Sequence, residues 1–337
     1  MRPLAIAIAS ALLVAACGGG GGGGAGPSAV GGRQQPPSVW PLRGTVDSGG
    51  EAARRPIVVK VPNDPAARPQ SGLANADLIW EIPVEGGLTR YAVVYHSMEA
   101  GSVGPVRSAR LSDLQYVPML EGILVHVGGS EPVLEKIRAA AAKGEFVDVD
   151  EFTTASAFER LTTKQAPYNA YTSTAKAREA AKQNPKVSAP VPAFDFSSDA
   201  PKTGTQAASV TLPYAAASQR VTYTWSGSAW TRVQAGAATK DAATNAEVAP
   251  VNVVIIKTDI TEIPGTADVT GAPSLDFRST GTGAVTVLRD GMRVDGTWKR
   301  SGAAMFSFAD STGAAITLRP GLTWIHIVPT DMQVGGA

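Results

Sequence analysis

Residues 85–110 read EGGLTRYAVVYHSMEAGSVGPVRSAR, and this stretch combines a clear strand signal with a group of arginines. Its centre, YAVVYHS at 91–97, is rich in β-branched and aromatic residues, which predicts a β-strand. Arg90 precedes the strand after two glycines, and Arg107 and Arg110 follow it after Gly104-Pro105. Because glycine lets the backbone turn sharply and approach other groups closely, we expect the arginines to lie beside glycine-rich turns.

Similar signals on both sides of this stretch predict an N-terminal α/β domain at residues 51–185. Apolar or alternating runs predict further strands at 57–61, 77–84 and 122–129. Helices are expected at 112–120, 131–142 and 173–183. Ser112 with Gln115 fits a capping box for the first of these helices, and Pro132 after Ser130 fits the first turn of the second.

The composition changes beyond residue 185. Residues 186–213 are rich in Pro, Ser and Ala and are predicted to be a linker. A β-rich C-terminal domain is expected at 214–330, with strand patterns at 220–225, 229–234, 251–257, 284–290, 292–296, 304–310 and 322–329. Asp290-Gly291 and Asp295-Gly296 are predicted turns. The predicted fold class is α+β, a mixed sheet-and-helix N-terminal domain followed by this β-rich domain.

The N-terminus carries an export signal. Arg2 precedes PLAIAIASALLVAAC, an apolar stretch shorter than the roughly 20 residues that a membrane span needs, so residues 1–16 are predicted to be a signal peptide. Val14-Ala15-Ala16-Cys17 is similar to a bacterial lipobox, which makes Cys17 the predicted lipidation site. Residues 17–50 begin with a run of glycines and are rich in Gly, Pro, Ser and Gln, which predicts a flexible tether.

These signals predict an exported protein held on the extracytoplasmic side of a bacterial membrane by acyl chains, such as palmitate, on Cys17. Cys17 is the only cysteine, so the sequence excludes an intramolecular disulfide and a cysteine nucleophile in the folded part. Lys+Arg number 30 and Asp+Glu 29. A nucleic-acid partner is not expected, because binding to phosphates normally requires a strong basic excess.

The arginines predict a surface that recognises an anion. Arg107 and Arg110 precede an expected helix start, where free N–H groups favour anions, and guanidinium groups bind carboxylates or phosphates. Arg68 lies in the turn-forming segment ARPQSG, and His126 ends a predicted buried strand. Asn169 lies between two tyrosines. The predicted ligand-binding residues are Arg68, Glu85, Arg90, Arg107, Arg110, His126 and Asn169.

The predicted function is a binding or assembly factor for an anionic envelope ligand, such as an envelope polymer, or for a partner protein. Two alternatives stay open. One is an envelope hydrolase or transferase that uses Glu85 or His126 as its acid or base. The other is a structural scaffold, in which the arginines pair with Asp77, Glu81 and Glu85. No cofactor or metal is predicted, because the three histidines lack ligand spacing.

Several longer motifs resemble the YerB-like bacterial lipoproteins, a family long labelled a domain of unknown function. They are NDPAARPQSGLANADLIWE (63–81), VEGGLTRYAVVY (84–95), GPVRSAR (104–110), VHVGGS (125–130), APYNAYTS (166–173), NVVIIK (252–257), GTGAVTVLRDGMRVDGTWKR (281–300) and LRPGLTWIHIVP (318–329). The resemblance implies a layered N-terminal domain, a β-rich C-terminal domain and envelope localisation, with no settled activity. Lys240-Asp241 departs from the family pattern, which has a histidine before the aspartate in many relatives.

Overall fold

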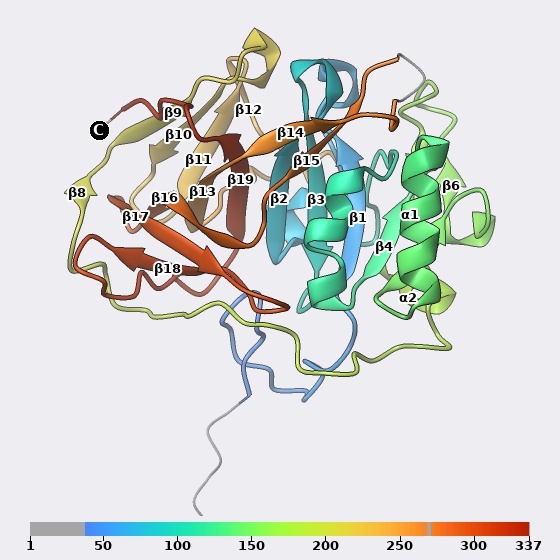
Figure 1. The fold of residues 1–337 in the computed structure, drawn as a ribbon, viewed down its shortest axis with the longest axis horizontal. Helices are drawn as coiled ribbons and strands as arrows, with labels where there is room; N and C mark the ends of the chain where they lie inside the picture. The colour runs from blue at the N-terminus through green and yellow to red at the C-terminus, as the bar shows by residue number, and fades with distance from the viewer. Residues whose placement is uncertain (1–37, 268–270, 337) are drawn as a thin grey trace, which may run out of the picture. The chain divides into compact units, whose positions relative to one another are not determined.

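The computed structural model describes residues 38–267 and 271–336, and its centre is a sheet of 11 strands (Figure 1). Ten strands follow the order β18-β17-β16-β13-β19-β2-β3-β1-β4-β5, and β8 pairs with β17. The bounds are β1 Ile57–Pro62, β2 Leu78–Pro83, β3 Thr89–Tyr95, β4 Ile123–His126, β5 Val147–Asp150, β8 Thr205–Gln206, β13 Asn252–Thr258, β16 Gly281–Arg289, β17 Met292–Arg300, β18 Ser307–Asp310 and β19 Thr323–Pro329. All the strands predicted in the N-terminal half form.

The two halves of the chain share this sheet. β19, the last strand, pairs in parallel with β13 on one side and with β2 on the other, with Trp324 opposite Ile79. The described residues, 38–267 and 271–336, form one compact unit. The segment predicted as a linker adds Val191 and Phe194 to a core cluster. The predicted domain boundaries therefore separate segments of the chain whose strands belong to one and the same central sheet.

The remaining described strands form three smaller sheets. A four-stranded sheet has the order β12-β11-β10-β9, and two hairpins pair β14 with β15 and β6 with β7. Their bounds are β6 Glu159–Arg160, β7 Ala170–Tyr171, β9 Ser209–Leu212, β10 Val221–Trp225, β11 Trp230–Gln234, β12 Ala237–Ala238, β14 Ile260–Ile263 and β15 Ser274–Phe277. The C-terminal half is therefore sheet-rich, as the sequence predicts.

The two α-helices of the described residues lie in the N-terminal half. They are α1 Glu131–Ala142 and α2 Thr174–Ala180, and short 3₁₀ helices occur at η1 Pro65–Ala67, η2 Leu73–Asn75, η3 Glu85–Gly87, η4 Leu111–Gln115, η5 Pro118–Leu120, η6 Ala155–Ala157 and η7 Ala217–Gln219. The bounds of α1 match the prediction, with Pro132 in its first turn. At the start of α2, the Ser173 hydroxyl accepts a hydrogen bond from the N–H of Lys176 at 3.2 Å. That side chain therefore satisfies one of the free N–H groups of the first turn.

The helix predicted at 112–120 is wrong, because the chain forms η4 and η5 instead. Pro118 lacks the N–H that a continuous helix would use there. The predicted capping box is also displaced, since the cap is Arg110, whose N–H donates to the Asp113 carboxylate at 2.8 Å. That carboxylate is held a second time by Lys60, so a contact distant in sequence sets where this segment turns.

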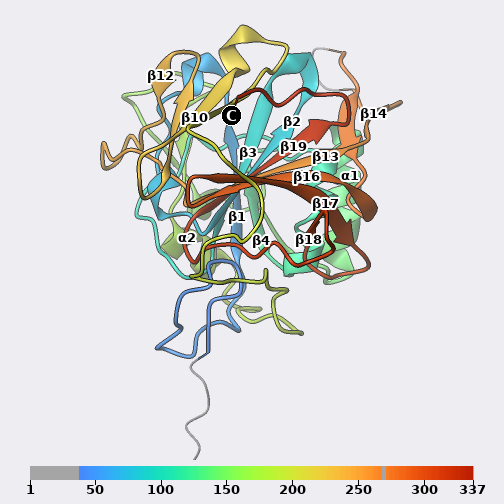
Figure 2. The same cartoon turned by 90° about the vertical axis from the view of Figure 1, so that its left-hand side faces the viewer.

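The two faces of the main sheet carry different cores. On one face, Val58 and Leu124 pack with Val133 and Ile137 of α1. On the other face, Val59 and Val125 pack with Ala177 of α2. The four-stranded sheet covers this second face in the C-terminal half, where its side chains share a core cluster with β13, β16 and β19. Figure 2 shows α1 and α2 on opposite sides of the sheet.

The predicted tether ends sooner than residue 50. Trp40 and Leu42 are buried, and the Trp40 ring meets the His96 ring edge-on at 4.9 Å. This part of the tether prediction is wrong, because two large apolar side chains join the folded unit although their neighbours are polar or small. The predicted signal peptide and Cys17 lie outside the described residues. No helix of residues 38–267 and 271–336 is long and apolar enough to cross a membrane.

Of the two predicted turn dipeptides, one forms a turn. Asp290 and Gly291 have φ angles of 52° and 72° and connect β16 to β17. Gly296 instead lies within β17, paired with Val285 and Asp310 on its two neighbours. A Cβ atom at Gly296 would lie 2.1 Å from the carbonyl oxygen of Ala309. The glycine is therefore needed for a close approach between strands, which makes the prediction of a turn there wrong.

Candidate functional site

Four predicted site residues come together beside the α1 face of the main sheet, and we call Glu85, Arg90, Arg107 and Arg110 the arginine cluster. Arg110 Nε donates to Glu85 Oε2 at 2.7 Å. Arg90 lies on β3 between Pro62 of β1 and Ile82 of β2, and its Nη1 donates to the carbonyl of Ser108 at 3.2 Å. Strand β3 and segment 107–110 thus converge on one position.

Backbone hydrogen bonds explain how Arg107 reaches this position. The parallel pairing of β1 with β4 stops at Val59 and Val125. Beyond that point the N–H of Arg107 donates to the carbonyl of Lys60 at 2.9 Å, and its own carbonyl accepts from Val127 at 3.1 Å. Segment 107–109 is therefore inserted between the carboxyl ends of two strands. Such ends are where sites open on α/β sheets.

Two guanidinium groups of the arginine cluster keep unused donors. Arg90 is 6% exposed, and its Nε is buried without a hydrogen-bond partner. Nε of Arg107 is buried in the same way, while its Cζ lies 5.7 Å from the centre of the Tyr168 ring. Neither arginine forms an ion pair with a carboxylate of the described residues. Because a buried donor without a partner costs free energy, both groups favour an incoming acceptor.

The charges around the arginine cluster are mostly positive. Burial and the nearby Arg110 lower the pKa of Arg90 to about 9, against the opposing charges of Asp64 and Glu85. Lys60 lies on the same face and pairs with Asp113 at 2.5 Å, with both side chains buried. Burial lowers the pKa of Lys60 although Asp113 opposes that change. A bound anion would relieve the mutual repulsion of these cations.

His126 lies outside the cluster and has a structural environment. It is buried, with Nδ1 2.9 Å from the carbonyl of Gly128 and Nε2 2.8 Å from the Asp148 carboxylate. Burial lowers the pKa of His126, but its hydrogen bond and attraction to Asp148 outweigh burial and raise that pKa above the usual value. Both partners are acceptors, so both ring nitrogens donate. The ring has no free nitrogen with which to act as a base.

The other two predicted residues are also placed elsewhere. Asn169 Oδ1 accepts a hydrogen bond from Arg160 at 2.9 Å on the surface, and Arg160 also pairs with Glu151. Arg68 donates through Nε and Nη2 to the side chain and carbonyl of Asn63 and to the carbonyl of Ser218. Arg68 therefore belongs to a polar network on the opposite face of the main sheet.

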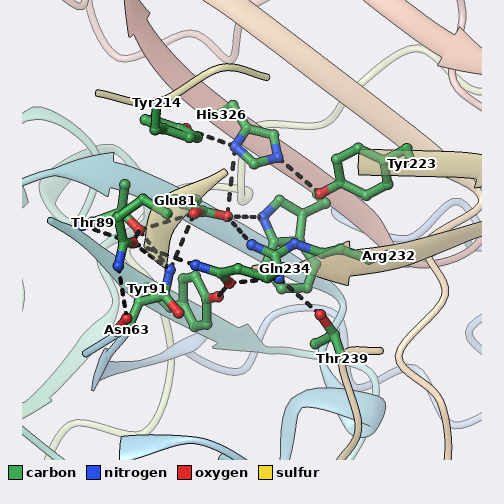
Figure 3. Close-up of polar contacts among 12 residues, drawn as sticks. Asn63, Glu81, Thr89, Tyr91, Tyr214, Tyr223, Arg232, Gln234, Thr239 and His326 are labelled. Atoms are coloured by element: carbon green, nitrogen blue, oxygen red, sulfur yellow. Dashed lines mark hydrogen bonds and ion pairs between the residues drawn. The ribbon is translucent and has the colours of Figure 1, made fainter. Parts of the chain in front are cut away.

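That network joins the main sheet to the four-stranded sheet, and apart from Arg68 its residues were not predicted as a site (Figure 3). Glu81 is fully buried and pairs with Arg232 at 2.8 Å. Its carboxylate also accepts from Trp324 Nε1 at 2.9 Å and from the Thr89 hydroxyl at 2.9 Å. His326, opposite Glu81 in the sheet, contacts two tyrosine hydroxyls. Every one of these groups has an internal partner.

The electrostatics of the network favour a charged Glu81–Arg232 pair beside a neutral histidine. Burial raises the pKa of Glu81, but the charge of Arg232, the nearby His326 and hydrogen bonds from Thr89 and Arg232 together outweigh burial and lower that pKa below the usual value. Burial lowers the pKa of His326 to about 4. A carboxylate and a histidine inside apolar strand sequences are the signals that could have revealed the network, since buried charges require partners.

No group of three or more His, Cys, Asp or Glu side chains among residues 38–267 and 271–336 could hold a metal ion. The arginine cluster consists of three guanidinium groups and one carboxylate. Its carboxylate, Glu85, is occupied by Arg110, with side-chain exposures of 5% and 12%. The arrangement can bind and orient a negatively charged group through guanidinium donors.

Comparison with known proteins agrees with the motifs. The sequence matches a family described as protein of unknown function (DUF3048), over residues 42–188 for its N-terminal domain and 210–325 for its C-terminal domain. YerB of Bacillus subtilis (strain 168), which is named as a candidate lipoprotein, is 31% identical over 294 residues, 86% of each chain. The crystal structure of YerB from Bacillus subtilis matches with a TM-score of 0.74 and 28% identity, over 87% of this chain and 97% of that one. The predicted resemblance is confirmed, and the chain belongs to the DUF3048 family, which it shares with YerB.

Proposed function

We propose that the protein is an exported lipoprotein, anchored through Cys17, whose folded part binds an anionic group of the envelope at the arginine cluster. The observation that carries this proposal is the pair of buried Nε donors on Arg90 and Arg107, neither of which has a hydrogen-bond partner among the described residues. A carboxylate or phosphate would supply acceptors for these two donors and negative charge beside the guanidinium groups. The relationship to a protein named as a lipoprotein supports the anchored location.

Binding is favoured over catalysis by the state of the two residues suggested as acid or base. Glu85 forms an ion pair with Arg110, and both nitrogens of His126 are committed to acceptors. A general base must be within hydrogen-bond reach of the proton that it removes and must have a free lone pair for it. His126 does not meet that condition in this structure.

Replacing Arg107 by alanine tests the binding site. We expect the affinity of the intact protein for inorganic pyrophosphate, measured by isothermal titration calorimetry, to fall by about ten-fold or more, the cost of losing one charge-assisted hydrogen bond. Arg107 is chosen because it is only half-buried, so the fold tolerates its removal better than that of Arg90.

Arg278→Ala is the matched control, since Arg278 is an exposed arginine that pairs with Asp259. It should leave the affinity within about two-fold of the wild-type value, as expected for a surface ion pair. Equal losses in the two variants, or no pyrophosphate binding by the wild-type protein, would contradict the proposal.

Replacing Cys17 by serine tests the anchor separately. We expect the variant to move from the membrane fraction to the soluble fraction, because acyl chains are attached through the thiol that it removes. Intact-mass measurement of the wild-type protein should show acylation of the first mature residue. Ser28→Ala, in the same glycine-rich segment, should stay with the membrane. An unmodified Cys17 in a membrane-bound wild-type protein would refute the anchor.

A further inference from the structure

A second recess lies on the face of the main sheet opposite the arginine cluster, against the four-stranded sheet. Its volume is about 310 Å³. Arg68 and Gln70 line it from the loop after β1, Tyr91 from β3, Gln234 from β11, and Thr239 and Lys240 from the turn after β12. Pro69 and the methyl groups of Ala237 and Ala238 form the apolar part of the wall. This volume is at the lower end of the range for small-molecule pockets, about 300–1,000 Å³.

The polar groups that line the recess are mainly donors. Nε and Nη2 of Arg68 are used internally, while no acceptor for Nη1 exists among the described residues. The ammonium of Lys240 is exposed and likewise has no acceptor in the described part of the chain. The Thr239 hydroxyl accepts from Arg232 Nη1 at 2.8 Å, which leaves its own proton to donate. None of the described residues that line the recess is an aspartate or glutamate.

The wall of the recess is held in place by the polar network behind it. The Tyr91 hydroxyl donates to Gln234 Oε1 at 3.0 Å, and Arg232 Nη1 donates to the same oxygen at 2.9 Å. Gln70 Nε2 donates to the carbonyl of Pro62 at 2.9 Å. Side chains fixed in this way lose little entropy when a ligand binds, so the recess is preorganised.

Asp241 fixes the position of Lys240. Its buried carboxylate accepts the N–H of Ala74 at 2.9 Å and that of Ala243 at 2.8 Å. The N–H of Ala242 donates to the carbonyl of Gln70 at 2.8 Å. The turn that carries Lys240 is thus tied to the loop that carries Arg68. The two cations are therefore held at the same recess, the turn of Lys240 by backbone contacts and the Arg68 side chain by its hydrogen bonds to Asn63 and Ser218.

We infer that this recess binds a small organic carboxylate. Two cations with free donors, a hydroxyl donor and no acidic side chain select an anion, and a guanidinium edge matches a carboxylate. The Tyr91 ring, Pro69 and the two alanine methyl groups suit a hydrocarbon body and distinguish the ligand from a bare inorganic ion. This site is separate from the arginine cluster, so the inference does not depend on the proposed function.

The test compares benzoate with its neutral isostere benzamide and with inorganic phosphate, using calorimetry on the intact protein. We expect benzoate to bind, and benzamide and phosphate to bind at least about ten-fold more weakly, since each lacks either the charge or the apolar body. Lys240→Gln should weaken benzoate binding by about ten-fold or more. Ala238→Trp, at an exposed position of the wall, should abolish binding by filling the recess.

Lys164→Gln, at an exposed lysine of the β6–β7 connection, is the matched control and should bind benzoate as the wild type does. Arg107→Ala should do the same, which separates this site from the arginine cluster. Circular dichroism of each variant establishes whether it is folded. If the Ala238→Trp variant is unfolded, the benzoate affinity of Lys240→Gln decides the test. Benzoate binding that is undetectable, matched by benzamide, or unchanged in Lys240→Gln overturns the inference.

Discussion

Replacement of Arg232 by methionine is expected to lower the free energy of unfolding by about 3–5 kcal/mol, because it leaves the Glu81 carboxylate buried without its cation. Both side chains of this ion pair are fully buried. The same guanidinium donates to Gln234 and Thr239, so its removal also takes one hydrogen bond away from each of these side chains. Urea denaturation followed by circular dichroism measures the loss.

Two further variants show whether charge is the cause. Adding Glu81→Gln to Arg232→Met should recover part of the lost stability, because a neutral amide still accepts from Trp324 and no longer carries an unpaired charge. Arg160→Met, which breaks the surface pair with Glu151, should cost no more than about 1 kcal/mol. An Arg232→Met variant as stable as Arg160→Met would falsify this account of the buried Glu81–Arg232 pair.

Replacement of Trp298 by alanine is expected to lower the free energy of unfolding by about 3–5 kcal/mol, because it opens a large cavity in the main core. Trp298 is fully buried on β17, with its ring 5.5 Å from the Phe306 ring. Its Nε1 donates to the carbonyl of Lys257 at 2.9 Å. The indole also lies against Gly283, where an added Cβ atom would be 2.5 Å from Nε1. The neighbouring backbone is therefore shaped around this ring.

Trp225→Ala is the control for this effect. Trp225 packs on Trp230 with ring centres 5.3 Å apart but is only half-buried, so less area is lost when it is truncated. The two variants are compared in urea by circular dichroism, since removing a tryptophan changes the fluorescence signal itself. If Trp298→Ala proves no less stable than Trp225→Ala, the β17 core does not depend on its tryptophan.

The strands could be predicted because their signals are local. The apolar runs at 57–61 and 251–257 coincide closely with β1 and β13, and the helix at 131–142 with α1. The turn at Asp290-Gly291 was also predictable, since both residues tolerate the positive φ that the connection requires. In each case the residues that specify the conformation are those that adopt it.

The predictions that were wrong depend on partners that are distant in sequence. Residues 112–120 form two 3₁₀ helices partly because Lys60 holds Asp113. Gly296 lies inside a strand because the Ala309 carbonyl approaches it closely. Trp40 joins the folded unit because His96 and Arg54 provide a surface for its ring. Local composition could not indicate any of these contacts.

The site predictions were likewise right where the signal was local and wrong where distant partners decide. Glycine and arginine content indicated an anion-binding surface, and Arg90, Arg107 and Arg110 do lie together with Glu85. Arg68, His126 and Asn169 were grouped with them although each has other partners. Arg68 instead lines the recess on the opposite face, whose other walls come from residues far along the chain.

The sequence by itself determined strands such as β1 and β13, the helix α1 and the family, because each of these depends on residue types at short spacing. Only the tertiary structure decided that the two halves share one sheet, that Glu81 pairs with Arg232, and which cations keep free donors. The reason is physical. Whether a buried charge is satisfied depends on groups up to hundreds of residues away, and chain folding alone brings them within hydrogen-bond distance.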